Sequence, residues 1–211
     1  MSKKVYISPS DQTENRYAWG NTNEHVQCQK IAEAEAAALR RSGVEVQVAA
    51  LGSTMAQRCA QSNAFKADIH NCVHTNACNR QVMGTRLFCY AIPGKGYDAC
   101  KAVFNELAPL SPGTSENIQA NSRLYEVRIP AAPTVYCECE FHDTVEGAKW
   151  ITPRRSEKPS PRVCASTWVW PSFRPGRKPP SPPSLLRAIP CTGSRWGPSP
   201  SAPTPTGCWK S

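Results

Sequence analysis

The 211-residue sequence contains no CxxC pair and no hydrophobic run long enough to span a membrane. The absence of paired cysteines argues against a zinc finger or a thioredoxin-like redox site. The segment 1–6 starts directly on a strand-like pattern and lacks the apolar stretch of a signal peptide. We therefore expect no membrane partner, and no export signal is visible in this chain.

Cysteine itself is abundant, with 11 residues, which is an odd number. Five of these cysteines lie inside apolar patterns, where cysteine usually acts as a small hydrophobic side chain. They are Cys28, Cys59, Cys72, Cys89 and Cys100. We expect buried free thiols here rather than a disulfide framework.

The net charge of +9 lies entirely in the last part of the chain. Residues 1–151 contain 15 Lys and Arg against 15 Asp and Glu, whereas residues 152–211 contain 10 basic residues against one acidic residue. The same tail holds 14 of the 20 prolines. A domain with no net charge gives no reason to expect a nucleic-acid partner, and the tail composition predicts disorder.

Short β-branched or aromatic runs alternate with helix-forming segments along residues 3–151. We predict strands at 5–7, 44–50, 68–74, 83–91, 124–129 and 134–138, and helices from about 24 to 41, at 55–66, at 96–107 and from 145 to 151. Asn23 is a suitable cap for the first helix, and Gly43 is a suitable stop. Such alternation predicts an α/β fold with a mostly parallel sheet and helices on both of its faces.

Polar residues gather where three of the predicted strands end, in the segments 8–12, 74–76 and 138–142. In open α/β sheets, sites form at the carboxyl ends of the strands. We therefore expect these three segments to converge on one site.

Three residues of this region can carry metal chemistry, although each also has a structural explanation. His74 is either a zinc ligand or a hydrogen-bonded histidine at a strand end. Glu24 is either a carboxylate ligand or a first-turn acid favoured by the helix dipole. Glu138 ends an apolar strand, where a carboxylate needs a partner or solvent. His70 lies roughly 13 Å from His74 along an extended strand, so the two cannot share one ion, and we interpret His70 as a packed or edge histidine.

Four segments together resemble the zinc-dependent N-acetylmuramoyl-L-alanine amidases of the amidase-3 type. They are Gly20–Glu24, Ala67–Ala77, Gly84–Phe88 and Glu138–Phe141. The resemblance covers residues 3–151 and implies a doubly wound sheet with helices on both faces. It also implies that Glu24 and His74 are zinc ligands and that Glu138 is the catalytic carboxylate.

The sequence departs from the family at the turn after the first strand. The family usually has a histidine ligand in this turn, but residues 8–12 contain none. A catalytic zinc ion usually has three protein ligands and one open position. We favour His142 as the third ligand, with Asp11 as the alternative, and Asn76 as a residue that contacts substrate.

The resemblance implies a Zn²⁺-dependent hydrolase that cuts the amide bond between N-acetylmuramic acid and L-alanine in peptidoglycan. Such an enzyme acts at the cell wall or extracellularly, as an autolysin or an endolysin, and we expect a monomer. The altered turn leaves a second hypothesis open, namely a catalytically inactive module that binds peptidoglycan.

The tail at 152–211 has no helical or strand period. A basic segment that contacts anionic wall polymers is one interpretation of it. A second is a frameshift near Ile151, because re-reading Lys158–Phe173 from the third codon base yields an amphipathic helical pattern. Under this hypothesis the last helix of the domain is truncated.

Overall fold

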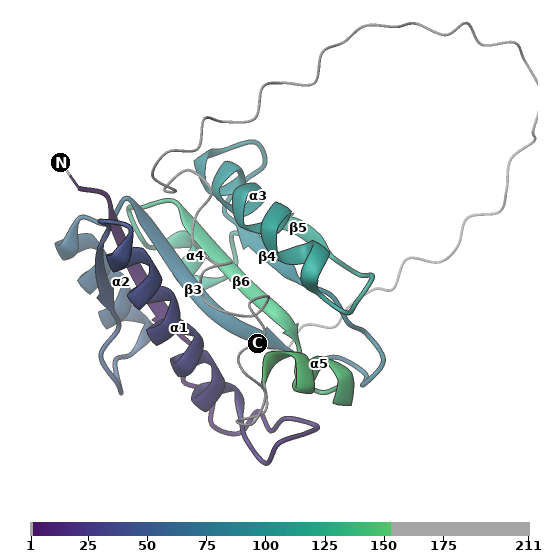
Figure 1. Ribbon diagram of the computed structural model, residues 1–211. Helices are drawn as coiled ribbons and strands as arrows, with labels where there is room; N and C mark the ends of the chain where they lie inside the picture. The colour runs from purple at the N-terminus through teal and green to yellow at the C-terminus, as the bar shows by residue number, and fades with distance from the viewer. Residues whose placement is uncertain (1, 153–211) are drawn as a thin grey trace, which may run out of the picture. The chain divides into compact units, whose positions relative to one another are not determined.

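The computed structural model describes residues 2–152, which form a six-stranded sheet with helices packed on it (Figure 1). The strand order is β2-β1-β3-β6-β4-β5. Strands β2, β1, β3 and β6 are mutually parallel, whereas β4 pairs with β6 in the antiparallel sense and β5 is parallel to β4. The strands are β1 (Lys4–Pro9), β2 (Glu45–Val48), β3 (Ile69–Asn76), β4 (Arg86–Cys89), β5 (Asn117–Ala120) and β6 (Thr134–Phe141).

Helices cover both faces of this sheet, which confirms the predicted fold class (Figure 1). Helices α1 and α3 pack on one face, and α2 and the short α4 lie on the other. None of the helices in residues 2–152 is long and apolar enough to cross a membrane. The helices are α1 (Glu24–Arg41), α2 (Met55–Phe65), α3 (Lys95–Leu107), α4 (Tyr125–Arg128) and α5 (Val145–Ile151), with a 3₁₀ turn at Ala108–Leu110.

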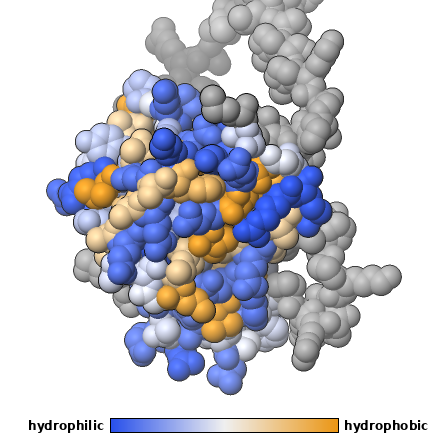
Figure 2. Space-filling model, turned by 90° about the vertical axis from the view of Figure 1, so that its left-hand side faces the viewer, coloured by the Kyte–Doolittle hydropathy of each residue, from blue (hydrophilic) through white to orange (hydrophobic). Residues whose placement is uncertain are grey.

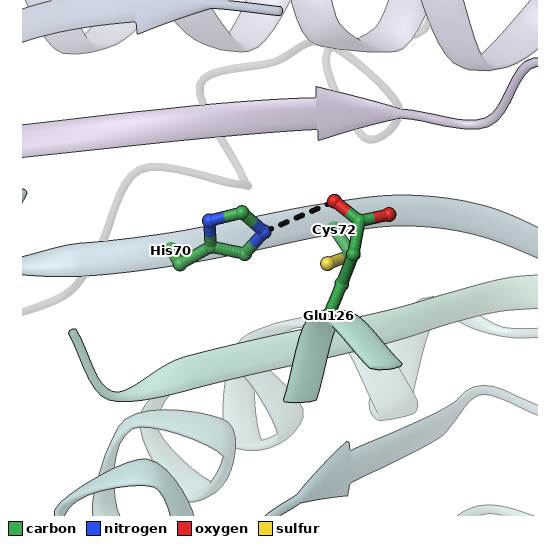
Figure 3. A group of neighbouring side chains, drawn as sticks. All are labelled: His70, Cys72 and Glu126. Atoms are coloured by element: carbon green, nitrogen blue, oxygen red, sulfur yellow. Dashed lines mark hydrogen bonds and ion pairs between the residues drawn. The ribbon is translucent and has the colours of Figure 1, made fainter. Parts of the chain in front are cut away.

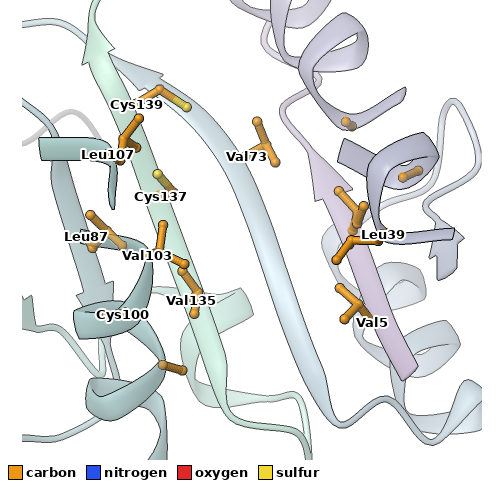
Figure 4. Close-up of a cluster of buried hydrophobic side chains, with 14 of the residues drawn as sticks. Val5, Leu39, Val73, Leu87, Cys100, Val103, Leu107, Val135, Cys137 and Cys139 are labelled. Carbon is orange, nitrogen blue, oxygen red and sulfur yellow. The ribbon is translucent and has the colours of Figure 1, made fainter. Parts of the chain in front are cut away.

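The main hydrophobic core lies between the sheet and the α1 and α3 helices (Figure 4). Leu39 of α1 belongs to it together with Val5 of β1, and Leu107 of α3 belongs to it together with Leu87 of β4 and Val135 of β6. Each fully buried side chain of this kind stabilises the fold by about 1.5–3 kcal/mol relative to an exposed one. This core leaves the even-numbered residues of β3, which include His70, Cys72 and His74, on the opposite face.

The five cysteines predicted to be buried free thiols are all buried and free. Cys137 and Cys139 of β6 are buried in the same core, on the side of the sheet opposite to Glu138. Strand alternation explains this division, because neighbouring residues of a strand point to opposite faces.

Local signals at the helix ends agree with the predictions. The Asn23 side chain accepts a hydrogen bond from the backbone N–H of Val26 and so caps α1 at the predicted residue. Thr54 and Gln57 form a reciprocal capping box at the start of α2. Such caps are worth about 1 kcal/mol each, because they satisfy N–H groups that have no partner inside the helix.

The predicted strand at 124–129 is wrong, since residues Tyr125–Arg128 form helix α4. The sheet instead has a further strand, β5, which pairs with β4 on the side away from β6 and lies in a segment without a predicted strand. The run Leu124–Ile129 has the β-branched and aromatic composition of a strand, but Glu126 and Val127 are both buried in the helical conformation. Tertiary contacts of these two side chains override the weak local preference of a short segment.

Figure 2 views the molecule from the side on which α2 lies in Figure 1. Hydrophobic and hydrophilic side chains are interspersed on this face. The exposed Leu51 and Met55 precede and begin α2, respectively. Scattered exposed apolar residues are normal on a folded domain. The tail predicted to be disordered lies outside the described residues, apart from Thr152.

Candidate functional site

The carboxyl ends of the central strands β1, β3 and β6 meet at one end of the sheet, as the sequence predicted. We call this end of the sheet the edge. The backbone N–H of Ser10 donates to the Val73 carbonyl at 2.8 Å, just beyond the end of β1. The backbone N–H of His142 donates to the Asn76 carbonyl at 2.8 Å, just beyond the end of β6. The three polar segments are thus linked directly at this edge.

Glu24 and His74 are in direct contact there. The Glu24 Oε1 atom lies 3.0 Å from His74 Nδ1 and accepts a hydrogen bond from the Thr75 backbone N–H at 3.3 Å. Its other oxygen accepts a 2.7 Å hydrogen bond from the Asn15 side chain. Glu24 is 1% exposed, so these contacts hold a buried carboxylate that α1 supplies from its first residue.

Glu138 lies next to His74, because the two residues are register partners in the parallel pair β3–β6. Tyr136 stacks on the His74 ring with centroids 4.5 Å apart. The His74 Nε2 atom and the Glu138 Oε2 atom are both buried and have no hydrogen-bond partner. Buried polar atoms without partners are rare in folded proteins, and they mark positions that a ligand can occupy.

A β-bulge lies immediately after this pair. His74 is opposite Glu138, but Asn76 is opposite Phe141, so β6 has one more residue than β3 in this interval. Glu140 lies within the bulge, and its carboxylate accepts hydrogen bonds from the Gly84 backbone N–H and the Ser111 hydroxyl. Bulges redirect side chains next to active sites, and here Glu140 anchors the bulge to neighbouring loops.

The three ionisable groups of the site influence one another. Burial alone would raise the pKa of Glu24, but hydrogen bonds and the charge of His74 outweigh it and lower this pKa. Burial alone would lower the pKa of His74, but Glu24 and Glu138 outweigh it and raise this pKa. Desolvation raises the pKa of Glu138 to about 7, with Glu24 adding to the effect and His74 opposing it. A carboxylate with a pKa near neutrality is suited to accept and return a proton.

The two residues considered as a third ligand have other contacts. Asp11 is exposed, and its carboxylate pairs with Arg58 at 3.4 Å. His142 is buried, its Nδ1 lies 2.9 Å from the Thr75 hydroxyl, and its ring stacks on Tyr17. Asn76 lies at the same edge, where its side chain accepts a hydrogen bond from the Ala77 backbone. The roles assigned to these residues stay predictions.

A second buried polar cluster lies further back on the same face of β3 (Figure 3). It consists of His70 and Cys72 of β3 and Glu126 of α4, and we call it the inner cluster. His70 Nε2 lies 3.2 Å from Glu126 Oε1, which also accepts a 2.6 Å hydrogen bond from the Ser8 hydroxyl. Of the two interpretations of His70, the structure shows a packed rather than an edge histidine, because it is fully buried and stacks on Tyr6.

The sequence pattern did not indicate Glu126 as part of a cluster, because it predicts a strand at this residue. One signal was present, namely a single acid within the otherwise apolar or aromatic run Leu124–Val127. Such an acid needs a partner when it is buried. The identity of that partner, 56 residues away in the sequence, depends on the tertiary fold.

Solved structures of cell-wall amidases share this fold. The N-acetylmuramoyl-L-alanine amidase AmiC2 of Nostoc punctiforme matches with a TM-score of 0.67 and 17% identity, over 81% of this chain and 94% of that one. The catalytic domain of CwlV, an N-acetylmuramoyl-L-alanine amidase from Bacillus (Paenibacillus) polymyxa var. colistinus, matches with a TM-score of 0.65 and 14% identity, over 79% and 92%. The catalytic domain of the CD27L endolysin, which targets Clostridia Difficile, matches with a TM-score of 0.61 and 19% identity, over 70% and 87%.

None of the curated proteins matches this chain. The family model for N-acetylmuramoyl-L-alanine amidases of the Amidase_3 type, in contrast, matches residues 5–159, which is well over half of the chain. The matched range includes Glu24, His74 and Glu138, and the fold of residues 2–152 is the one that the solved amidases share. The chain therefore belongs to the N-acetylmuramoyl-L-alanine amidase family.

Proposed function

We propose that this protein hydrolyses the amide bond between N-acetylmuramic acid and L-alanine in peptidoglycan, with a zinc ion held by Glu24 and His74. The observation that carries the proposal is the 3.0 Å contact of His74 Nδ1 with Glu24 Oε1, beside the buried and unpartnered Glu138 Oε2 on the adjacent strand. Membership of the amidase family supports the reaction and its substrate.

The side chains of Glu24 and His74 suit a zinc ion. Imidazole nitrogen and carboxylate oxygen bind zinc at about 2.0–2.2 Å, so two such ligands of one ion lie roughly 3.3 Å apart. The 3.0 Å separation of His74 Nδ1 and Glu24 Oε1 is close to this value, so an ion between them would take the place of the proton that these two atoms share. A zinc ion held here supplies polarisation of the substrate carbonyl and a water with a lowered pKa.

Glu138 is the proton-transfer group of this proposal. Its raised pKa lets the carboxylate accept a proton from the attacking water and pass it to the leaving amine of L-alanine. Its position beside His74 brings this carboxylate to the polarised bond. Arg86, the register partner of Glu138 on β4, has a positive charge that opposes the rise in pKa and so favours the ionised base.

The orientation of His74 is set by two neighbours. Tyr136 stacks on one face of the ring, and Glu24 contacts Nδ1. A ring fixed in this way does not have to be ordered when a ligand binds, which reduces the entropy cost of binding. The site is therefore preorganised by residues of β3, β6 and the first turn of α1.

His142 remains our predicted third ligand, with Asp11 as the alternative. His142 would have to release Thr75 and turn away from Tyr17, whereas Asp11 would have to leave Arg58. Zinc content of purified His142→Ala and Asp11→Ala proteins separates the two. A loss of zinc in one variant identifies the ligand, and unchanged stoichiometry and affinity in a variant exclude that residue.

The activity test uses purified cell walls. We expect wild-type protein to reduce the turbidity of a peptidoglycan suspension and to release stem peptides with a free L-alanine amino group. Glu138→Ala should abolish both signals, and Glu33→Ala, which removes an exposed carboxylate from the middle of α1, is the matched control. Wall binding without release of stem peptides by the wild type would instead favour the inactive binding module.

The substrate also defines where the protein would act. Peptidoglycan is part of the cell wall, so an enzyme of this type works at the wall or outside the cell, as an autolysin or an endolysin. The endolysin among the structural matches is one example of such a protein. Assignment of the source of the gene to a phage or to a cellular genome distinguishes the two roles.

A further inference from the structure

We propose that the inner cluster of His70, Cys72 and Glu126 is a second, structural metal site that takes zinc. The three side chains offer one nitrogen, one sulfur and one oxygen, and these donor atoms all lie within 4.8 Å of one another (Figure 3). Within residues 2–152, no other group of three His, Cys, Asp or Glu side chains meets this spacing. The cluster goes beyond the proposed catalytic site, with which it shares no residue.

The fold supplies these donors from two elements. His70 and Cys72 are two residues apart on β3, so they point to the same face. Helix α4 brings Glu126 to that face, and its Oε1 atom lies 3.2 Å from His70 Nε2. Two ligands on a tetrahedral zinc ion, each about 2.0–2.2 Å from it, are separated by roughly 3.3 Å. The Cys72 sulfur lies within 4.8 Å of both atoms and has to approach them to reach its own bonding distance to zinc of about 2.3 Å.

Charge balance also favours a divalent ion here. All three residues are at most 3% exposed, and an isolated charge in such a place is costly. A zinc ion with one thiolate, one carboxylate and one neutral imidazole carries no net charge. Transition metals with thiolate and imidazole ligands are typically zinc, whereas magnesium and calcium prefer oxygen ligands.

Arg58 is the nearby cation that could oppose a metal ion, but its charge is already compensated. Its guanidinium donates to the carbonyls of Pro9 at 2.6 Å and Ser53 at 2.9 Å, and it pairs with the Asp11 carboxylate at 3.4 Å. It also donates to the Ser8 hydroxyl, whose own proton goes to Glu126. Ser8 thus stands between Arg58 and the cluster and offers a further oxygen beside the proposed ion.

The inner cluster is separate from the catalytic site. His74 follows Cys72 by two residues on the same strand, which corresponds to roughly 6.6 Å along β3, and follows His70 by roughly 13 Å. One ion cannot reach His70 and His74 together. The inner ion would connect α4, a helix of only four residues, to the middle of β3. The role is structural, since the donors are buried away from solvent and the Ser8 hydroxyl oxygen, 2.6 Å from Glu126 Oε1, is available as the fourth neighbour that a closed zinc site needs.

A cobalt substitution experiment tests the proposal, because a thiolate ligand is present in the inner cluster but not among Glu24, His74 and Glu138. A thiolate–cobalt band therefore reports on the inner cluster alone. The full-length protein is loaded with Co²⁺ in place of zinc, and the near-ultraviolet band of a thiolate–cobalt bond is recorded. We expect the band in the wild type, its loss in Cys72→Ala and one metal equivalent fewer in that variant. Cys59→Ala is the matched control, because Cys59 is a buried thiol close to Cys72 but outside the cluster.

A second variant distinguishes loss of the metal site from misfolding of the domain. Glu126→Gln keeps the size of the side chain but removes its charge, and it should weaken cobalt binding at the thiolate while circular dichroism shows a folded domain. His74→Ala should retain the thiolate band even when activity is lost, so failure of the catalytic proposal is distinguishable. A wild-type protein without the band, or a band that persists in Cys72→Ala, would overturn the second site.

Discussion

The two polar regions on one face of β3 differ in how well the hydrogen-bonding atoms of their carboxylates are satisfied. In the inner cluster, the Glu126 carboxylate accepts hydrogen bonds from Ser8 and contacts His70. At the strand ends, the Glu138 Oε2 atom is buried without a hydrogen-bond partner, whereas each region has one histidine nitrogen without a partner, His70 Nδ1 or His74 Nε2. A similar histidine–carboxylate contact therefore occurs twice, 3.2 Å apart in the inner cluster and 3.0 Å apart at the edge. Only the edge also contains a second carboxylate, that of Glu138, with an oxygen atom that has no hydrogen-bond partner.

The pKa values follow the same division. Burial would raise the pKa of Glu126, but hydrogen bonds from His70 and Ser8 outweigh it and lower this pKa, so its charge is well compensated. Desolvation instead raises the pKa of Glu138 to about 7. A compensated carboxylate stabilises the fold, whereas an under-compensated one at a site edge is available for chemistry. The predictions below test this contrast, from the largest expected effect to the smallest.

Glu138→Gln should produce the largest loss of activity. Removal of a general base typically costs about 10²–10⁴-fold in rate, and we expect a fall of that size in kcat on purified peptidoglycan. Zinc content should stay unchanged, because Glu138 is the base rather than a ligand in our proposal. Loss of zinc together with activity would show that Glu138 is a zinc ligand rather than the general base.

His74→Ala should abolish zinc binding at the edge site. Removal of a residue that hydrogen-bonds to a metal ligand typically weakens metal affinity by about 10–100-fold. Removal of the ligand itself should weaken the affinity by more than this. Competition with a chelator measures the affinity. His25→Ala is the matched control, because His25 follows Glu24 in α1 and its ring nitrogen Nδ1 lies 3.3 Å from the Ser10 carbonyl rather than from a carboxylate. Equal affinities in the two variants would contradict the assignment of His74.

Glu35→Gln should change how stability depends on pH. Glu35 of α1 is a buried carboxyl with neither a histidine nor a proposed ion beside it, and desolvation raises its pKa to about 8, opposed by hydrogen bonds from Asn71. The folded state therefore holds this proton between the unfolded pKa of about 4.5 and the folded value of about 8. Stability from this group is complete below pH 4.5 and is lost as the pH rises through 8.

Each unit of pKa shift corresponds to about 1.4 kcal/mol. Between pH 4.5 and 8, the free energy of unfolding of the wild type should therefore fall by on the order of a few kcal/mol relative to that of Glu35→Gln. Urea unfolding of both proteins at pH 5, 7 and 9 measures the difference. Glu33→Gln changes an exposed carboxylate two residues away in α1 and should show the same pH dependence as the wild type. Parallel stability curves for wild type and Glu35→Gln would show that burial alone does not keep a carboxyl protonated in this fold.

Asp11→Asn should have the smallest effect. The Asp11 side chain is 57% exposed, and its pairing with Arg58 at 3.4 Å is therefore worth about 0–1 kcal/mol. We expect a change within that range in the free energy of unfolding and no change in zinc content. A marked loss of zinc would instead make Asp11 the third ligand and would extend the edge site into the turn after β1.

Several features of the site were accessible from the sequence. Helix α1 begins at Glu24 after the Asn23 cap, and β3 carries His74 near its end, both as predicted. The expectation that the ends of β1, β3 and β6 converge is confirmed, because parallel neighbouring strands end at the same edge. The alternation of short strands and helices was a sufficient basis for these points.

Other features were decided by contacts between distant residues. The contact of Glu24 with His74 joins residues 50 positions apart, and that of His70 with Glu126 joins residues 56 positions apart. The conversion of the predicted strand at 124–129 into α4 depends on the burial of Glu126 on the sheet. The bulge in β6 is likewise visible only against its partner β3.

The sequence by itself determined the fold class, the family resemblance and the candidate residues, because periodicity, capping and motif residues are local properties of the chain. Only the tertiary structure decided which carboxylate meets which histidine, which atoms stay without partners and where an acid in an apolar run finds its partner. The physical reason is that solvation and hydrogen bonding of a buried group depend on every element packed around it. A local pattern does not contain that information.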